Sequence, residues 1–167
     1  MPLSALRPSP GSDPYLLSLN QAAPVFRVFM PRHLAVGPRH TDAAYHAQPN
    51  EINVWIPFTD AFESNSLHVE SAAGAADFEP IACGYGELYL FRGNECEHYS
   101  ECNLTGATRV SMDFRVIRQQ ELAAHPVLEA TDTPRGGGGG KQSRGAGEYF
   151  TLGRYYRRTA ESGHRTL

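Results

Sequence analysis

Short apolar runs separated by turn residues dominate the chain from Val25 to Ile117. The runs are rich in valine, isoleucine and aromatic residues, which favour β-strands, and clusters of Gly, Pro, Asn and Asp separate them. They read VFRVFM, INVWIPF, SLHVE, ELYLF and RVSMDFRVI. No convincing amphipathic helix lies between them. The pattern therefore predicts an antiparallel all-β sandwich, barrel or jelly roll rather than a parallel α/β sheet.

The last of these runs has an unusual polar face. Strand alternation gives one face to Arg109, Ser111, Asp113 and Arg115, and the other to Val110, Met112, Phe114 and Val116. A polar face that lines a barrel interior indicates a bound ligand. The apolar face has few helices to cover it, so we expect cover by the tail Tyr149–Tyr156, the N-terminal arm or a second subunit in a homodimer.

The flanking segments divide the chain into four parts. Residues 1–24 contain five of the twelve prolines and predict an arm that lies over the domain formed by residues 25–134. Residues 135–147 include five consecutive glycines and predict a flexible linker. Residues 148–167 form an aromatic tail for which disorder and docking on the barrel both stay open. The stretch RQQELAAHPVLEA, at the end of the domain, allows one short helix.

Composition narrows the class of partner. The 167 residues suit one domain, and a net charge of −3 without strong clustering predicts no nucleic-acid or membrane partner, which leaves a small molecule. Three cysteines are an odd number that fits neither a disulfide framework nor paired zinc ligands, so we expect a reducing compartment. No run is long and apolar enough for a membrane span or a secretory signal. We therefore expect a cytoplasmic protein, with organellar targeting left open.

His40 and Asp42 are candidate metal ligands. In an extended segment, residues i and i+2 point to the same side and can bind one ion. His98 follows the ELYLF run and is the natural candidate for a third ligand. Two histidines and one carboxylate leave three open coordination positions, as in non-haem Fe(II) oxygenases. Spacing alone leaves an alternative open, in which His46 and Glu51 join His98 in a cupin-like site and replace Asp42.

Arg109 suggests a second ligand besides the metal. A keto acid that chelates iron through one end still has a distal carboxylate, and the planar guanidinium of arginine matches a carboxylate with two charge-assisted hydrogen bonds. The hydroxyl of Ser111, two residues further on, points the same way along a strand. The co-substrate that this pattern indicates is 2-oxoglutarate.

The order of these motifs resembles the phytanoyl-CoA dioxygenase superfamily. It runs from His-x-Asp through the tryptophan strand EINVWIPFTD to an Asn-Ser-Leu segment, then Gly-Glu-Leu, a distal histidine and an arginine. The segments HTDAAYHAQPNEINVWIPFTDAFESNSLHVES and GNECEHYSECNLTGATRVSMDFRVI resemble a branch that includes a streptomycin-biosynthesis protein. The resemblance covers roughly Val25 to Ile117.

The resemblance implies a fold, a reaction and a set of site residues. The fold is a double-stranded β-helix (jelly roll, cupin-like) with few short helices. The reaction is oxidation, such as hydroxylation, of a small molecule by an Fe(II)- and 2-oxoglutarate-dependent dioxygenase that releases succinate and CO2. His40, Asp42 and His98 would bind iron. The residues that would contact 2-oxoglutarate are Arg109, Ser111, Trp55 and Ser100.

Three further residues and two other functions complete the expectations. Tyr45, His46 and Asn53 are candidates for contact with the substrate, whose identity the sequence does not give. One alternative function is a cupin-type metalloenzyme that works without 2-oxoglutarate. The other is a non-catalytic jelly-roll binding module, which would have no use for a metal triad.

Overall fold

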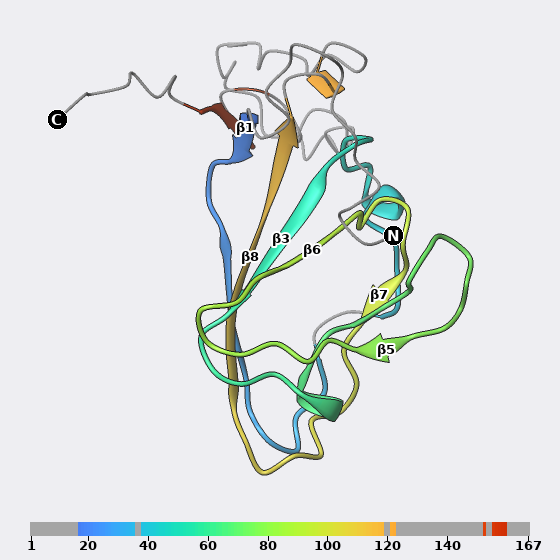
Figure 1. The fold of residues 1–167 in the computed structure, drawn as a ribbon, viewed down its shortest axis with the longest axis vertical. Helices are drawn as coiled ribbons and strands as arrows, with labels where there is room; N and C mark the ends of the chain where they lie inside the picture. Colours follow the sequence, from blue (N-terminus) through green and yellow to red (C-terminus); the bar gives the residue numbers. More distant parts are fainter. Residues whose placement is uncertain (1–16, 36–37, 119–120, 123–151, 153–154, 160–167) are drawn as a thin grey trace, which may run out of the picture.

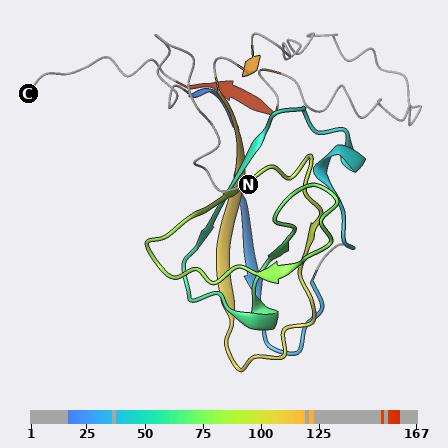
Figure 2. The same cartoon turned by 45° about the vertical axis from the view of Figure 1, so that its right-hand side comes forward.

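The structure, a computed structural model, describes residues 17–35, 38–118, 121–122, 152 and 155–159. Its strands form two antiparallel sheets that face each other across the molecule (Figures 1 and 2). The larger sheet has the order β6-β3-β8-β1-β9, and β2 also pairs with β8. Its strands are β1 (Leu17–Gln21), β2 (Val25–Phe29), β3 (Ile52–Pro57), β6 (Tyr89–Phe91), β8 (Arg109–Arg118) and β9 (Tyr156–Arg158). The smaller sheet, of order β5-β4-β7, contains β4 (His68–Val69), β5 (Glu79–Pro80) and β7 (His98–Tyr99).

Strand β8 organises the larger sheet. It has ten residues, and its first half pairs with β2 while its last three residues pair with β1. On its other side, β3 pairs with β8 over six residues, from Ile52↔Val116 to Pro57↔Ser111. Alternation along β8 turns Arg109, Ser111 and Asp113 inward, because these residues are buried while the residues between them are only partly covered. The predicted polar inner face is therefore present.

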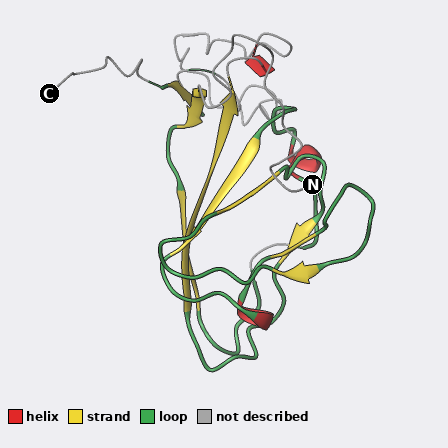
Figure 3. Cartoon of the chain, viewed as in Figure 1, coloured by secondary structure: helices red, strands yellow, loops and turns green. Residues whose placement is uncertain are grey.

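The predicted fold class is confirmed. The described residues form an all-β, jelly-roll-like structure, in which the 3-10 turns η2 (Asp42–Tyr45) and η3 (Glu63–Asn65) are short helical elements between strands (Figure 3). Each predicted apolar run contains one strand. The short helix allowed after Ile117 and the glycine-rich linker lie almost wholly outside the described residues.

The N-terminal boundary differs from the prediction. Strand β1 lies within the segment 1–24 that was predicted as an arm, yet it pairs with both β8 and β9. Leu19 of this strand is buried in a small apolar cluster with Ile117, Leu152 and Tyr156. The prolines of this segment all lie before or after β1, so they do not interrupt its hydrogen bonds. The sheet thus begins before Val25.

A second apolar cluster packs on the inner side of the larger sheet. It contains Trp55 of β3 together with Ala61, Val69, Ile81, Cys83 and Cys96. All three cysteines are free thiols. This cluster connects the two sheets, because its members come from both sheets and from the loops between them.

The outer face of the larger sheet is partly open in the described part of the chain. Phe26 and Val28 of β2 are 62% and 58% exposed. The tail strand β9 extends the sheet edge by pairing with β1 instead of lying over this face. Cover by a second subunit stays a prediction. No helix among the described residues is long and apolar enough to cross a membrane.

Candidate metal centre

Two chain segments bring His40, Asp42 and His98 together. His40 and His98 form an isolated antiparallel bridge, with backbone hydrogen bonds of 3.2 and 2.9 Å between them. Thr41 is extended, and Asp42 opens the 3-10 turn η2. His40 and Asp42 therefore flank one extended residue, which lets their side chains point to the same side. The carboxylate of Asp42 sits at a turn rather than on a strand. His98 comes from β7 of the smaller sheet.

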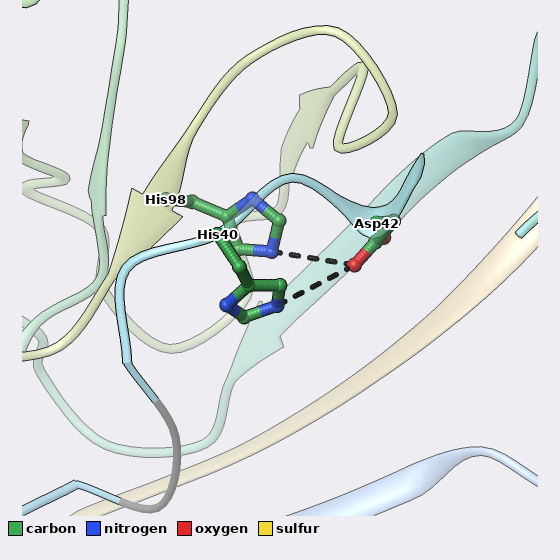
Figure 4. Close-up of side chains that lie close together, drawn as sticks. All are labelled: His40, Asp42 and His98. Atoms are coloured by element: carbon green, nitrogen blue, oxygen red, sulfur yellow. Dashed lines mark ion pairs between the residues drawn. The ribbon is translucent and has the colours of Figure 1, made fainter. Parts of the chain in front are cut away.

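The side chains of these residues converge on one point (Figure 4). Asp42 Oδ1 lies 3.7 Å from His40 Nε2 and 3.5 Å from His98 Nε2. One ligand atom of each residue lies within 4.8 Å of the others. Asp42 and His98 are buried, and His40 is partly covered. Two imidazole nitrogens and a carboxylate oxygen at this spacing can hold a divalent metal ion.

Backbone carbonyl groups orient both imidazole rings. Nδ1 of His40 lies 2.8 Å from the carbonyl oxygen of Pro38, and Nδ1 of His98 lies 3.1 Å from that of Cys96. Since a carbonyl oxygen can only accept, Nδ1 must carry the proton and donate it. Each Nε2 then has its lone pair free and directed toward the centre. This is the usual arrangement of metal-binding histidines.

The second oxygen of Asp42 is hydrogen-bonded by the protein. Asn53 Nδ2 donates to Oδ2 at 2.7 Å, and Arg115 Nη2 donates to the same oxygen at 3.1 Å. Burial by itself raises the pKa of Asp42, but the charge of Arg115 and the hydrogen bond from Asn53 help to hold that pKa well below its ordinary value. Asp42 is therefore a carboxylate at neutral pH, as a metal ligand must be.

Arg109 is a buried cation that makes no ion pair with an acidic residue of the described part of the chain. It is 4% exposed, and its guanidinium lies 5.1 Å from the ring of Phe29 and 5.5 Å from the ring of Trp55. One nitrogen donates to the carbonyl of Asn65 at 2.7 Å, while Nε has no partner. None of the ion pairs among the described residues includes Arg109. Burial and the like charge of Arg27 lower its pKa to about 10, against an opposing effect of the charge of Asp113, so it stays charged at neutral pH.

Arg109 and the two candidate histidine ligands, His40 and His98, line one cavity of about 500 Å³. Trp55, Ser100 and Asn53 also line it. Ser111 is fully buried on the same face of β8, and its hydroxyl has no hydrogen-bond partner among the described residues. The cavity therefore brings together two histidines of the triad, an arginine and several other residues that the sequence singled out, with Asp42 beside the histidines.

The remaining candidates have different positions. Tyr45 is 52% exposed and packs its ring edge against His40, at 5.0 Å between ring centres. His46 is exposed in a left-handed conformation after the turn η2. Asn53 donates a hydrogen bond to Asp42 and accepts one from the backbone of Gly93. Its side chain therefore supports the metal-ligand candidate Asp42.

The alternative ligand set is not assembled. Glu51 is buried and accepts a hydrogen bond from the hydroxyl of Tyr156, and neither Glu51 nor His46 belongs to the metal-capable cluster of the described residues. Glu70, another buried carboxylate, accepts backbone hydrogen bonds from Gly74, Ala76 and Glu97. Arg115 pairs with Asp42 and Asp113.

Sequence reasoning placed Arg115 and Asp113 on the correct face but gave them no function, and it missed Gly93 and Phe29. Alternation along β8 was the available signal for Arg115. Nothing in the local sequence pointed to Gly93, whose contacts are with residues far away in the chain.

Comparison with known proteins supports the fold. No family model matches the chain. The chain is 38% identical over 97 residues to the "Streptomycin biosynthesis protein StrG" of Streptomyces griseus, which covers 58% of this chain and 45% of that protein. The chain thus spans less than half the length of the curated relative that it matches.

The chain also resembles solved structures in its fold. A structure described as "non-heme monooxygenase; ThoJ apo" matches 60% of this chain and 47% of its own, with a TM-score of 0.51 and 15% identity. A nickel complex of ThoJ, also described as a non-heme monooxygenase, matches 60% of this chain and 45% of its own at 18% identity, with a TM-score of 0.49. The chain therefore has the fold of the ThoJ apo structure over the matched region.

Proposed function

We propose that this protein is a non-haem Fe(II)- and 2-oxoglutarate-dependent oxygenase that oxidises a small molecule. His40, Asp42 and His98 would hold the iron, and Arg109 would bind the distal carboxylate of 2-oxoglutarate. The donor set fits the metal, because two neutral imidazoles and one carboxylate suit Fe(II) and leave positions open for other ligands. Bound iron and its keto-acid co-substrate supply the activation of O2, with release of succinate and CO2.

The observation that carries this proposal is the unpaired charge of Arg109. A buried guanidinium that makes no direct ion pair is costly, and the rings of Phe29 and Trp55 and the more distant charge of Asp113 offset only part of that cost. A ligand carboxylate would provide the missing counter-charge and a hydrogen-bond acceptor for Nε. The guanidinium shares its cavity with the two histidines of the triad, so one molecule with two acidic ends can reach both the metal site and Arg109.

The residues around the cavity have separate tasks in this proposal. The carbonyl groups of Pro38 and Cys96 keep both histidines in the tautomer that binds a metal. The rings of Trp55 and Phe29 lie within 5.5 Å of the guanidinium of Arg109 and stabilise its charge. Ser100 lines the cavity, and the buried hydroxyl of Ser111 lies on the same face of β8 as Arg109. The volume of the cavity is within the range of small-molecule sites.

The comparisons add support of a more general kind. The structure of similar fold is described as a non-heme monooxygenase, and the curated relative is described as a biosynthesis protein. Both suit an oxidation of a small molecule. Since the chain spans less than half of that relative, the substrate of the whole protein is left to experiment.

The decisive experiment compares two keto acids. Binding of 2-oxoglutarate and of pyruvate to the Mn(II)-loaded protein is measured by calorimetry, for the wild type, for Arg109→Met and for Arg157→Met. Pyruvate chelates a metal in the same way but lacks the distal carboxylate. We expect Arg109→Met to weaken binding of 2-oxoglutarate by about ten- to a hundredfold, the size of a lost charge-assisted pair, and to leave pyruvate unchanged.

Arg157 is the matched control, because it is an exposed arginine outside the cavity lining. Its replacement should change neither affinity. If Arg109→Met binds 2-oxoglutarate as tightly as the wild type does, Arg109 does not have the assigned role. Turnover of a substrate with Fe(II) and no need for 2-oxoglutarate would instead favour a metalloenzyme of the cupin type.

A further inference from the structure

Gly93 lies unusually close to the proposed ligand Asp42. A Cβ atom placed on Gly93 would lie 2.6 Å from Oδ2 of Asp42 and 2.5 Å from Nδ2 of Asn53. Carbon atoms do not approach polar atoms this closely, so any side chain at this position must displace Asp42 or Asn53. The close approach, rather than an unusual backbone angle, is what requires glycine here.

The backbone of Gly93 also binds both of these residues. Its carbonyl oxygen accepts the amide proton of Asp42 at 2.7 Å, and its amide donates to Oδ1 of Asn53 at 3.2 Å. Asn53 in turn donates a hydrogen bond from Nδ2 to Oδ2 of Asp42. Gly93 therefore positions the carboxylate from two directions, through the main chain of Asp42 and through the side chain of Asn53.

Arg115 of the neighbouring strand β8 also donates to Oδ2 of Asp42, and its own side chain is fixed by an ion pair. Its Nη1 donates to Oδ2 of Asp113 at 2.6 Å, and Asp113 Oδ1 accepts from Nε of Arg27 at 2.6 Å. The series Arg27, Asp113, Arg115 and Asp42 alternates in charge, so each ion has an opposite neighbour. It runs from β2 across β8 to the metal-ligand cluster.

We propose that Gly93 and Arg115 are positioning residues of the metal centre: they hold Oδ2 of Asp42 away from the metal, so that the carboxylate binds through Oδ1 alone. This proposal rests on the proposed metal centre. Oδ2 accepts hydrogen bonds from Asn53 and Arg115, whereas Oδ1 is the oxygen that faces both imidazole Nε2 atoms. A one-oxygen carboxylate leaves an additional position open for other ligands.

The test measures metal binding rather than activity. Affinity for Mn(II) and the visible absorption of bound Co(II) at saturating metal are recorded for the wild type, Gly93→Ala, Arg115→Lys and Gly106→Ala. Gly93→Ala changes no charge, and Arg115→Lys keeps the charge but loses the fork that bridges two carboxylates. Gly106 is the matched control, because a Cβ atom there would meet no atom within 4 Å.

We expect Gly93→Ala to bind Mn(II) about ten- to a hundredfold more weakly and to alter the Co(II) spectrum, because supporting residues of metal sites have effects of this size. Arg115→Lys should change the Co(II) spectrum in the same direction, and Gly106→Ala should match the wild type. If Gly93→Ala does not fold, the Co(II) spectrum of Arg115→Lys decides the question. Wild-type affinity and an unchanged spectrum in the folded variants would overturn the proposal, whereas absence of metal binding by the wild type would overturn the metal centre itself.

Discussion

At the scale of single residues, Glu51 shows how burial sets the chemistry near the candidate site. It is 1% exposed, Tyr156 donates a hydrogen bond to its Oε1, and its Oε2 has no partner among the described residues. Burial raises the pKa of Glu51 to about 8; the charge of Arg115 opposes this rise and the charge of Asp42 adds to it. Glu51 is therefore mostly a neutral acid at pH 7 in the folded protein.

This raised pKa predicts a specific dependence of stability on pH. Between about pH 4.5 and pH 8 the folded protein keeps a proton on Glu51 that the unfolded chain has released, so the free energy of unfolding falls as the pH rises and levels off above that window. Glu51→Gln is neutral in both states and should reduce this fall, by an amount on the order of a few kcal/mol between pH 5 and pH 8.

Urea unfolding at several pH values measures this effect. The control is Glu79→Gln, a replacement of an exposed carboxylate on β5, which should keep the slope of the wild type. Parallel stability curves for the wild type and Glu51→Gln over this range would show that Glu51 titrates at an ordinary pKa.

At the scale of elements, the strands β1 and β9 complete one side of the larger sheet, although they come from opposite ends of the described chain. Leu19 and Tyr156 are almost wholly buried, and the hydroxyl of Tyr156 reaches Glu51 just before β3. Gln21 of β1 also accepts a hydrogen bond from the backbone of Arg115 through its side chain. These contacts link the sheet edge to the strands that carry the candidate site.

Removal of one hydroxyl group tests the position of β9. Tyr156→Phe keeps the buried ring but leaves Oε1 of Glu51 without its donor, which should lower the free energy of unfolding by about 1–3 kcal/mol. Chemical denaturation measures the loss, and Tyr85→Phe is the control because Tyr85 is 78% exposed. An equal stability of the two variants would show that β9 does not hold Tyr156 against Glu51.

At the scale of the whole molecule, the candidate metal centre joins both sheets. His98 lies on β7 of the smaller sheet, whereas Asn53 and Arg115, which hold Asp42, lie on β3 and β8 of the larger one. A bound ion would therefore connect elements that are far apart in the sequence. Ligands that bind only the folded state stabilise it in proportion to the logarithm of their concentration.

We expect Mn(II) to stabilise the folded protein against heat. At about one hundred times its dissociation constant the gain is about 2.7 kcal/mol, which for a chain of this size raises the melting temperature by roughly 5–10 °C. Differential scanning fluorimetry with Mn(II), and again after addition of a chelator, measures the change. Asp42→Asn should abolish the shift.

The same measurement distinguishes the two ligand sets. His46→Asn should keep the full shift, because His46 is exposed and outside the cluster, and asparagine accepts its left-handed backbone conformation. A shift that survives Asp42→Asn and disappears in His46→Asn would point to the alternative set with Glu51.

The sequence by itself determined the class of fold and the positions at which chemistry is concentrated. Alternation with a period of two follows from strand geometry, so the runs of β2, β3 and β8 and the polar face of Arg109 to Arg115 were predictable. His40 and Asp42 could be paired for the same reason, because one extended residue lies between them. These features depend on residues that are near in the chain.

Only the tertiary structure decided which distant groups meet. The bridge between His40 and His98, the hydrogen bond from Arg115 to Asp42, the approach of Gly93 and the pairing of β1 with β9 all join segments separated by many residues. A local pattern specifies which face of a strand a side chain occupies, but not the distance to another strand. That distance depends on how the two sheets pack, which is why the support of Asp42 and the unpaired charge of Arg109 became visible only in the folded molecule.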